Sequence, residues 1–214
     1  MPTIGVLDLQ GGVVEHLEHL AALAVPARRV KAAAALDGIS GLIIPGGEST
    51  CLIRLLRRYG LDRAIEERFR AGLKLWGTCA GAILLAREVV GEAAHLGLMD
   101  IRVQRNAFGS QLDSFNLRVD IPALDEASVP LTFIRAPKIL SLGEGVRSLL
   151  KIDDFHAAAE DSSILVTVFH PELTANLAFH RYFARKCGIP VRAGREIRDT
   201  RWRADSWVSH APIP

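Results

Sequence analysis

Cys79 lies at the centre of the sharpest chemical motif in this 214-residue chain, the Gly-Thr-Cys-Ala-Gly of residues 77–81. The motif has the form Gly-x-nucleophile-x-Gly and separates two apolar runs, which is typical of a strand–turn–helix nucleophile elbow. Small neighbours let such a turn hold its nucleophile in a strained conformation, and the start of a helix favours a thiolate. We therefore expect Cys79 to be a nucleophile. The alternative is a small buried cysteine at a glycine-rich turn.

A base and its orienting group are available in the His-Pro-Glu of residues 170–172, which follows an apolar run. Catalytic groups of open α/β sheets gather at the carboxyl ends of the strands. Pro171 favours an extended conformation for the residue before it, and the i, i+2 spacing then brings imidazole and carboxylate together. We expect His170 to act as the base for Cys79 and Glu172 to orient His170. Without Cys79, a solvated surface turn would be the preferred interpretation.

A third motif, the Pro-Gly-Gly-Glu-Ser-Thr of residues 45–50, also follows a short apolar run. Its two glycines allow positive φ and close backbone approach. We expect the N–H groups of Gly47 and Ala80 to form an oxyanion hole. The alternative is a strand-to-helix turn with Ser49 or Thr50 as N-cap, and the two interpretations are compatible. A phosphate-binding P-loop is disfavoured because its Lys-Ser/Thr ending is absent.

The elements that must position these motifs alternate between apolar runs and segments of helical periodicity. This alternation, with short glycine-rich links, predicts an α/β fold with a mainly parallel sheet. Short alternating runs between residues 98 and 150 predict hairpins or edge strands. Strands are expected at residues 3–7, 41–44, 73–77 and 164–168, and helices at 13–23, around 52–56 and 65–69, at 80–90, and from a Thr174 cap through 177–183.

The composition is that of a soluble globule, with 49% apolar and 23% charged residues. A formal charge of +2 gives no strong field favouring nucleic acid or an anionic membrane. Three cysteines are too few for a disulfide scaffold and favour a reducing compartment. We find no apolar run of about 18 residues and no basic leader, so we expect neither a membrane span nor a signal peptide. The sequence predicts a cytoplasmic protein.

The chain divides into a domain at residues 1–188 and a C-terminal extension at 189–214. Residues 191–214 contain five arginines and three acidic residues, and their excess of +2 equals the formal charge of the whole chain. Mixed charge with two tryptophans and few aliphatic side chains favours a solvated appendage over a dedicated binding arm. The extension is left unassigned.

Together the three motifs resemble the triad (class I) glutamine amidotransferases, with Cys, His and Glu in that chain order. Further blocks resemble the glutaminase subunits of pyridoxal 5′-phosphate synthase, over roughly residues 3 to 187. The blocks at residues 105–109 (Arg-Asn-Ala-Phe-Gly) and 133–137 (Phe-Ile-Arg-Ala-Pro) are the most specific. The other blocks are residues 4–7, 9–11, 45–50, 77–81, 95–98, 113–115 and 169–174.

The resemblance implies a three-layer α/β fold with a mainly parallel central sheet, flanking helices and an antiparallel β extension. It implies hydrolysis of L-glutamine to L-glutamate and ammonia through a glutamyl thioester on Cys79, without a cofactor or metal. Arginine suits a carboxylate through its two-pronged geometry, although without the resemblance a surface ion pair would be preferred for Arg105 and Arg135. The implied glutamine pocket is lined by Gly47, Glu48, Ser49, Arg105, Ile134 and Arg135.

The same resemblance implies that ammonia passes to a synthase (lyase) subunit, which builds pyridoxal 5′-phosphate from ribose 5-phosphate and glyceraldehyde 3-phosphate. The family assembly places twelve glutaminases around a dodecameric synthase core. Gln10 lies in the loop implied to couple the partner to the oxyanion hole. Asp8 and Gly12 depart from the usual family residues beside that loop.

Three alternatives stay open: another amidotransferase of the same class, a cysteine peptidase or esterase on a related sheet, and a non-enzymatic scaffold. The blocks around Arg105 and Arg135 disfavour the first, and the His-x-Glu spacing disfavours the second. His16 and His19 share a helical face, but no third ligand of suitable spacing favours a metal. We expect that pair on a solvated or interface face.

Overall fold

The computed structural model describes residues 1–107 and 114–191, and a mixed β-sheet runs through the centre of this region. The strand order is β2-β1-β3-β4-β12-β11-β9-β6-β5, and β10 pairs with β11. The strands are β1 (Ile4–Leu7), β2 (Ala27–Val30), β3 (Gly41–Ile44), β4 (Lys74–Thr78), β5 (Ala86–Val89), β6 (Met99–Gln104), β9 (Lys138–Leu142), β10 (Arg147–Ile152), β11 (Phe155–Glu160) and β12 (Ile164–Thr167).

One half of the sheet is parallel, because β1 pairs with β2 and β3, and β4 pairs with β3 and β12, all in the same direction. Every residue of β1, β3 and β12 is buried, as continuous apolar runs predict for strands covered on both faces. The carboxyl ends of β1, β3, β4 and β12 therefore meet at one edge. The sequence motifs that follow these four strands are brought together there.

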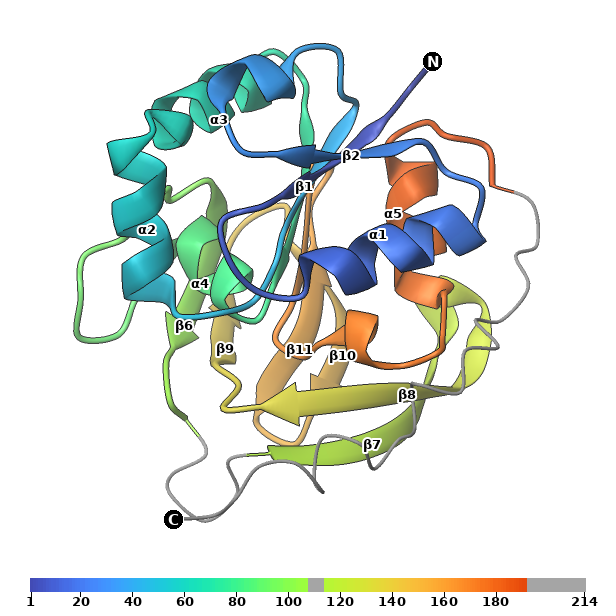
Figure 1. The fold of residues 1–214 in the computed structure, drawn as a ribbon. Coiled ribbons are helices and arrows are strands. Elements are labelled where there is room, and N and C mark those ends of the chain that lie inside the picture. The colour runs from blue at the N-terminus through green and yellow to red at the C-terminus, as the bar shows by residue number, and fades with distance from the viewer. Residues whose placement is uncertain (108–113, 192–214) are drawn as a thin grey trace, which may run out of the picture.

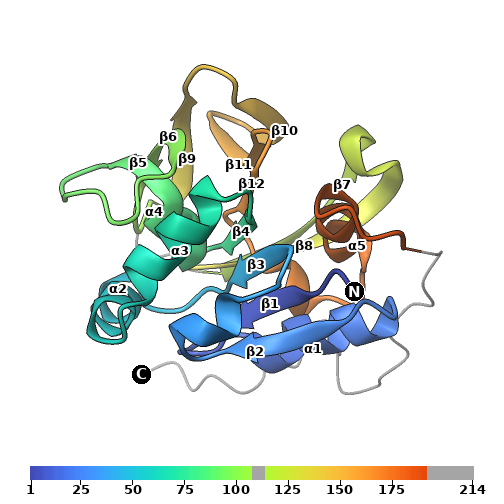
Figure 2. The ribbon, with the colours of Figure 1, turned by 90° about the horizontal axis from the view of Figure 1, so that it is seen from above.

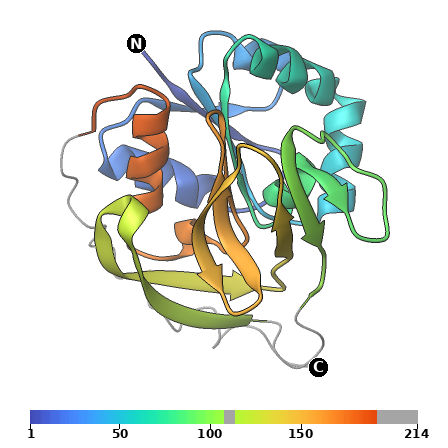
Figure 3. The same cartoon turned by 180° about the vertical axis from the view of Figure 1, so that it is seen from behind.

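The other half of the sheet is mostly antiparallel. Strand β11 runs antiparallel to β12, β9 and β10, and β6 runs antiparallel to β9. A separate two-stranded antiparallel ribbon, β7 (Ser114–Ile121) with β8 (Glu126–Ile134), crosses below the sheet (Figure 3). The predicted antiparallel extension is confirmed, and the end of β8 carries Ile134 to the edge where the motifs meet.

Helices cover both faces of the parallel half and make the fold three-layered (Figures 1 and 2). Helices α1 and α5 lie together on one face, and α2, α3 and α4 lie on the other. The α-helices are α1 (Val13–Ala22), α2 (Ser49–Arg58), α3 (Leu61–Arg70), α4 (Ala80–Leu85) and α5 (Ala178–Lys186), and the 3-10 turns are η1 (Ala33–Leu36), η2 (Pro122–Leu124) and η3 (Pro171–Leu173).

The helix predicted at residues 80–90 is wrong in its second half. Helix α4 ends at Leu85, and the next four residues form β5, which pairs in parallel with β6. Within β5, Ala86 and Val89 are buried while Arg87 and Glu88 are exposed. A mostly apolar stretch, here interrupted by Arg87 and Glu88, does not distinguish a buried helix from a strand, so periodicity alone missed the change.

The predicted Thr174 cap of the last helix is also wrong. Helix α5 begins at Ala178, whose backbone N–H donates to Asn176 Oδ1 at 2.8 Å. The Thr174 hydroxyl instead donates to the carbonyl of Pro171 at 3.0 Å. Thr174 therefore closes the η3 turn, the N-cap of α5 is Leu177, and Asn176 accepts from the first backbone N–H of the helix.

Parts of several sequence predictions lie outside the described residues. These are Phe108, Gly109 and Asp113 of the family blocks and residues 192–214 of the C-terminal extension. The division at residue 188 stays a prediction. None of the helices in the described ranges is long and apolar enough to cross a membrane.

Candidate active site

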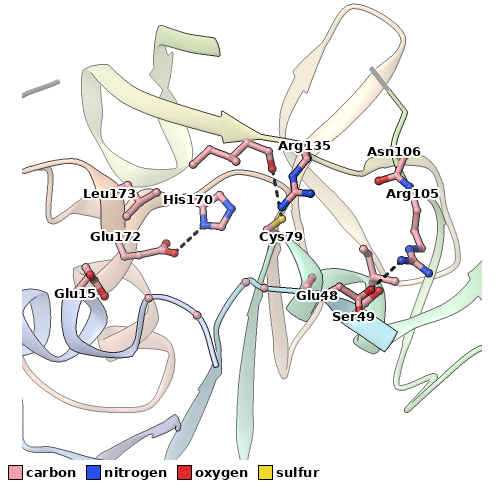
Figure 4. A pocket seen from close by; sticks show the side chains of 17 residues that line it. Glu15, Glu48, Ser49, Cys79, Arg105, Asn106, Arg135, His170, Glu172 and Leu173 are labelled. Carbon is pink, nitrogen blue, oxygen red and sulfur yellow. Dashed lines mark hydrogen bonds and ion pairs between the residues drawn. The ribbon is translucent and has the colours of Figure 1, made fainter. Parts of the chain in front are cut away.

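The four loops at the carboxyl edge of the parallel strands enclose a cavity of about 460 Å³ (Figure 4). Figure 4 shows Glu172 and Glu15 at one end and Arg105 with Glu48 at the other. The predicted site residues that line it are Gly47, Glu48, Ser49, Cys79, Ala80, Arg105, Ile134, Arg135, His170 and Glu172. The parallel half of the sheet, with the ends of β6 and β8, thus brings together side chains that are far apart in the sequence.

Cys79 has the strained backbone that its motif predicts, with φ 48° and ψ −105° between β4 and α4. The glycines on either side are required by close packing. A Cβ on Gly81 would collide with the backbone oxygen of Ile44, and one on Gly77 would lie 2.5 Å from the carbonyl carbon of Gly81. The thiol is 7% exposed and faces the Ile134 carbonyl at 4.0 Å. Helix α4 has six residues, so its dipole supports a thiolate less than the predicted longer helix would.

His170 and Glu172 form a direct hydrogen bond, with 2.8 Å between His170 Nδ1 and Glu172 Oε1. Glu172 is fully buried in the η3 turn. The backbone N–H of His170 donates to the carbonyl of Thr132 at 2.8 Å, which ties the turn to β8. With Nδ1 held by Glu172, the other ring nitrogen of His170 is the one available to Cys79.

The charges of this pair support each other. Burial alone would lower the pKa of His170, but the Glu172 carboxylate and the hydrogen bond with Cys79 raise it to about 10. Burial alone would raise the pKa of Glu172, but the rings of His16 and His170 lower it to about 2. At neutral pH the pair is an imidazolium beside a carboxylate.

Of the two glycines after β3, Gly46 packs closely against His170 and Cys79, and Gly47 packs against Gln10. A Cβ on Gly46 would lie 2.5 Å from His170 Cε1 and 3.2 Å from Cys79 Cβ. Gly47 has φ 141°, a conformation that other residues rarely adopt. Gln10 is the one predicted residue outside the cavity lining, and its Nε2 donates to the carbonyl of Glu48 at 2.7 Å. The loop after β1 is thereby fastened to the loop after β3.

Glu48 is the N-cap of α2, so the alternative that placed the cap at Ser49 or Thr50 was wrong. Its carboxylate accepts from the backbone N–H groups of Thr50 at 3.1 Å and Cys51 at 2.6 Å. Arg105 donates to Glu48 Oε1 at 3.3 Å and to Glu92 Oε2 at 2.9 Å. Arg105 therefore makes ion pairs, which is the alternative to ligand binding that its sequence context offers. It also lines the cavity.

Ile134 and Arg135 reach the cavity at the end of β8. Arg135 is exposed and has a positive φ of 42°. Residues with such strained backbones cluster at functional sites. The arginine that is most open to solvent at this cavity is therefore Arg135.

Sequence reasoning missed several cavity-lining residues, among them Glu15, Asn106 and Leu173. It was also wrong about His16 and His19, which are fully buried rather than solvated. The signal was present, because His16 lies three residues after Val13 and four before Leu20, on the same helical stripe. The expectation failed because a polar residue such as His16 is easily assigned to the edge of the polar face.

The three-layer fold, the cysteine at the elbow and the His–Glu pair at the carboxyl edge of the sheet are together the features of a triad-type glutamine amidotransferase. The chain belongs to the SNO glutamine amidotransferase family, which matches residues 6–189. The protein is 42% identical to a solved structure described as a glutamine amidotransferase, with a TM-score of 0.82 over 87% of this chain and 99% of that one. The fold class expected from the sequence is confirmed.

Two curated relatives are both described as pyridoxal 5′-phosphate synthase subunit PdxT. The protein from Syntrophus aciditrophicus is 54% identical over 212 residues, covering 98% of this chain and 95% of the relative. The protein from Clostridium beijerinckii is 48% identical over 183 residues, covering 85% of this chain and 96% of the relative. Because the first alignment covers 98% of the chain, it includes most of the predicted extension at 189–214.

Proposed function

We propose that the chain is the glutaminase subunit of a pyridoxal 5′-phosphate synthase and hydrolyses L-glutamine to L-glutamate and ammonia. The observation that carries this proposal is the meeting of Cys79, His170 and Glu172 in one cavity, in a member of the SNO family. The relatives described as synthase subunits supply the biosynthetic assignment.

In the first half-reaction, His170 takes the thiol proton of Cys79, and the resulting thiolate attacks the side-chain carbonyl carbon of glutamine. The His170 imidazolium gives its proton to the departing nitrogen, ammonia leaves, and a γ-glutamyl thioester remains on Cys79. In the second half, neutral His170 takes a proton from water, and the resulting hydroxide attacks the thioester. Glutamate leaves and the thiolate with its imidazolium returns. Glu172 holds His170 in orientation throughout.

Both half-reactions pass through a tetrahedral oxyanion that needs donors. We assign these to the backbone N–H groups of Gly47 and Ala80. Support comes from position, because Ala80 follows the nucleophile and Gly47 follows Gly46, which packs against Cys79. The positive φ of Gly47 is a second support, since it is tolerated only by a residue without a side chain.

The glutamine pocket in this proposal consists of Gly47, Glu48, Ser49, Arg105, Ile134 and Arg135. The Ser49 hydroxyl supports it, because this oxygen is buried and has no partner among the described residues. A buried hydroxyl without a partner is costly, and a bound polar substrate would satisfy it. The open guanidinium of Arg135 suits the α-carboxylate, and Glu48 is an acceptor for the α-ammonium.

Ammonia is of use only if it reaches the enzyme that consumes it, so the proposal includes a synthase subunit as partner. We assign the family arrangement of twelve glutaminases around a dodecameric core, in the cytoplasm. Gln10 is placed to couple the two proteins, because it bonds to the segment that carries the oxyanion donor. A partner that moves the loop after β1 would move Gly47 with it.

Glutamate release from L-glutamine, measured with and without the candidate synthase subunit, tests this function. Cys79→Ala is expected to lower the rate by at least about a thousandfold, since the covalent route is lost. Cys51→Ala is the matched control, because this cysteine is exposed and lies one turn from the site. Activity that survives Cys79→Ala, or wild-type protein that forms no glutamate with the synthase present, would contradict the proposal.

A further inference from the structure

A buried group of histidines lies directly behind the triad carboxylate. His16 of α1 and His180 of α5 are both fully buried, and 2.8 Å separates His16 Nδ1 from His180 Nε2. On its other side, His16 Nε2 lies 3.5 Å from Glu172 Oε2. The polar chain from the cavity therefore runs from His170 through Glu172 to His16 and His180.

The protons of this chain can be placed from its partners. Glu172 Oε1 is taken by His170, and Glu172 Oε2 and His16 Nε2 are both buried without a hydrogen bond to any described residue. An ionised carboxylate only accepts, so His16 is useful to it only with a proton on Nε2. His16 Nδ1 is then an acceptor, and His180 Nε2 must be its donor. One arrangement of protons suits all three contacts.

Other roles for the group fit less well. Burial lowers the pKa of His16 to about 4, against the opposing effect of Glu172, so its ring is neutral at pH 7 and adds no charge to the site. Within residues 1–107 and 114–191, no three His, Cys, Asp or Glu side chains are arranged to hold a metal ion. The Trp76 ring packs against His16 in a T-shaped arrangement, with 5.5 Å between the ring centroids.

We propose that His16 is a positioning residue for the triad, which donates from Nε2 to the second oxygen of Glu172 while His180 fixes the His16 tautomer. The role of the His16–Glu172 contact in turnover depends on the glutaminase function proposed above. The tautomer itself does not depend on that function. The contact keeps the carboxylate plane aligned with His170 Nδ1, which the His170–Glu172 hydrogen bond alone leaves free to rotate.

The tautomer is tested first, by NMR of the full chain labelled with ¹⁵N in its histidine rings. His16 is expected to carry its proton on Nε2, and His180 likewise, throughout pH 6–8. His16→Gln assigns the His16 signals by their disappearance. A His16 ring protonated on Nδ1, or on both nitrogens at pH 7, would overturn the proposal. This measurement needs neither substrate nor partner.

The positioning role is tested by a matched pair of variants, His16→Gln and His16→Met, with glutamate release measured in the presence of the synthase subunit. The two side chains have similar length, but only glutamine has a donor at the position of Nε2. His16→Met is expected to lower kcat/KM about tenfold and to move the alkaline limb of the pH profile about one unit lower. His16→Gln is expected to stay within about threefold of wild type.

The titratable groups that face His16 are Glu172, His170, His180 and His19. His19→Gln is the control, because its ring nitrogens contact the backbone carbonyls of Glu15 and Thr174. It is expected to lower the thermal midpoint and leave the alkaline limb in place.

Equal losses in His16→Met and His16→Gln with an unmoved pH limb would show a merely structural role and overturn the proposal. A wild-type protein with no glutaminase activity would instead remove the proposed function, whatever the tautomer.

Discussion

At the scale of single residues, the site depends on one histidine that two neighbours hold in its charged form. His170 lies between the buried Glu172 carboxylate and the Cys79 thiol, and its pKa rises to about 10 in spite of burial. The ring of His170 is held by a 2.8 Å hydrogen bond to Glu172 and by close packing against Gly46. Both features can be tested by substitution.

Glu172→Gln removes the charge that stabilises the imidazolium, so the pKa of His170 is expected to fall towards its ordinary value. The wild-type kcat/KM for glutamate release should decline only as the pH approaches about 10, where the imidazolium is lost. In the variant the decline should begin at least about two units lower, with a maximal rate reduced about a hundredfold. A pH–rate profile from 6 to 10.5 measures both. An unshifted alkaline limb would show that Glu172 does not act through His170.

Gly46→Ala places a methyl group 2.5 Å from His170 Cε1, so the imidazole must move. A displacement of about 1 Å from the reacting geometry costs on the order of a hundredfold in rate, and this is the loss expected in kcat for glutamate release. Gly38→Ala is the control, since no atom lies within 4 Å of that position. Its activity should equal that of wild type. If Gly46→Ala were as active as the control, the close packing described here would be wrong.

At the scale of elements, the site is a product of strand direction. Four strands of one parallel half-sheet end at the same edge, and each is followed by a loop that contributes to the cavity. The elbow between β4 and α4 is closely packed, because Gly81 lies against the carbonyl of Ile44 at the end of β3. That contact fixes the helix to the neighbouring strand.

Gly81→Ala is expected to destabilise the protein by about 1–3 kcal/mol through overpacking against β3. The sign is informative, because replacing a helical glycine by alanine would otherwise stabilise by about 0.5–1 kcal/mol. Urea unfolding followed by circular dichroism gives the free energy of unfolding. A stability equal to or above that of wild type would mean that α4 and β3 are farther apart than described.

Some of these elements could be predicted from the sequence, and others could not. Strands β1, β3, β4 and β12 follow from short, mainly apolar runs, and their shared direction follows from the alternation with helices. The switch from α4 to β5 was missed because Ala86 and Val89 continue the apolar stretch, and only pairing with β6 makes it a strand. His16 was misplaced because its burial depends on partners from η3 and α5, which no local pattern reveals. The triad itself was predictable because its motifs are local.

At the scale of the whole molecule, a cluster of buried histidines lies next to the site, between the sheet and the helices α1 and α5. His16, His19 and His180 are fully buried between α1, α5 and the sheet. Burial is the largest cause of the lowered pKa of each, and it is partly opposed by Glu172 at His16 and by backbone hydrogen bonds at His19. The fold thus makes these histidines harder to protonate than they are in the unfolded chain.

Global stability is therefore expected to fall as the pH drops from about 6.5 to about 4. Over this range the unfolded chain binds protons at histidines that the folded protein keeps neutral, so acid favours unfolding. Glu172 and His170 do not change this sign, since the stabilisation from Glu172 is lost as the pH falls from about 4.5 to about 2, and that from His170 is lost only as the pH rises above 6.5. Urea midpoints at pH 7, 6, 5 and 4.5 measure the slope. A flat profile would contradict the buried neutral cluster.

The central claim is that glutamine is opened by Cys79 through a covalent thioester. The most direct measurement is an acid quench of the full chain with its synthase subunit during turnover of isotope-labelled L-glutamine, followed by digestion and mass spectrometry. The account predicts a γ-glutamyl label on the peptide that contains Cys79, removed by hydroxylamine and absent in Cys79→Ala. Glutamate formed at the full rate with that peptide unlabelled, or a label that persists in Cys79→Ala, would contradict it.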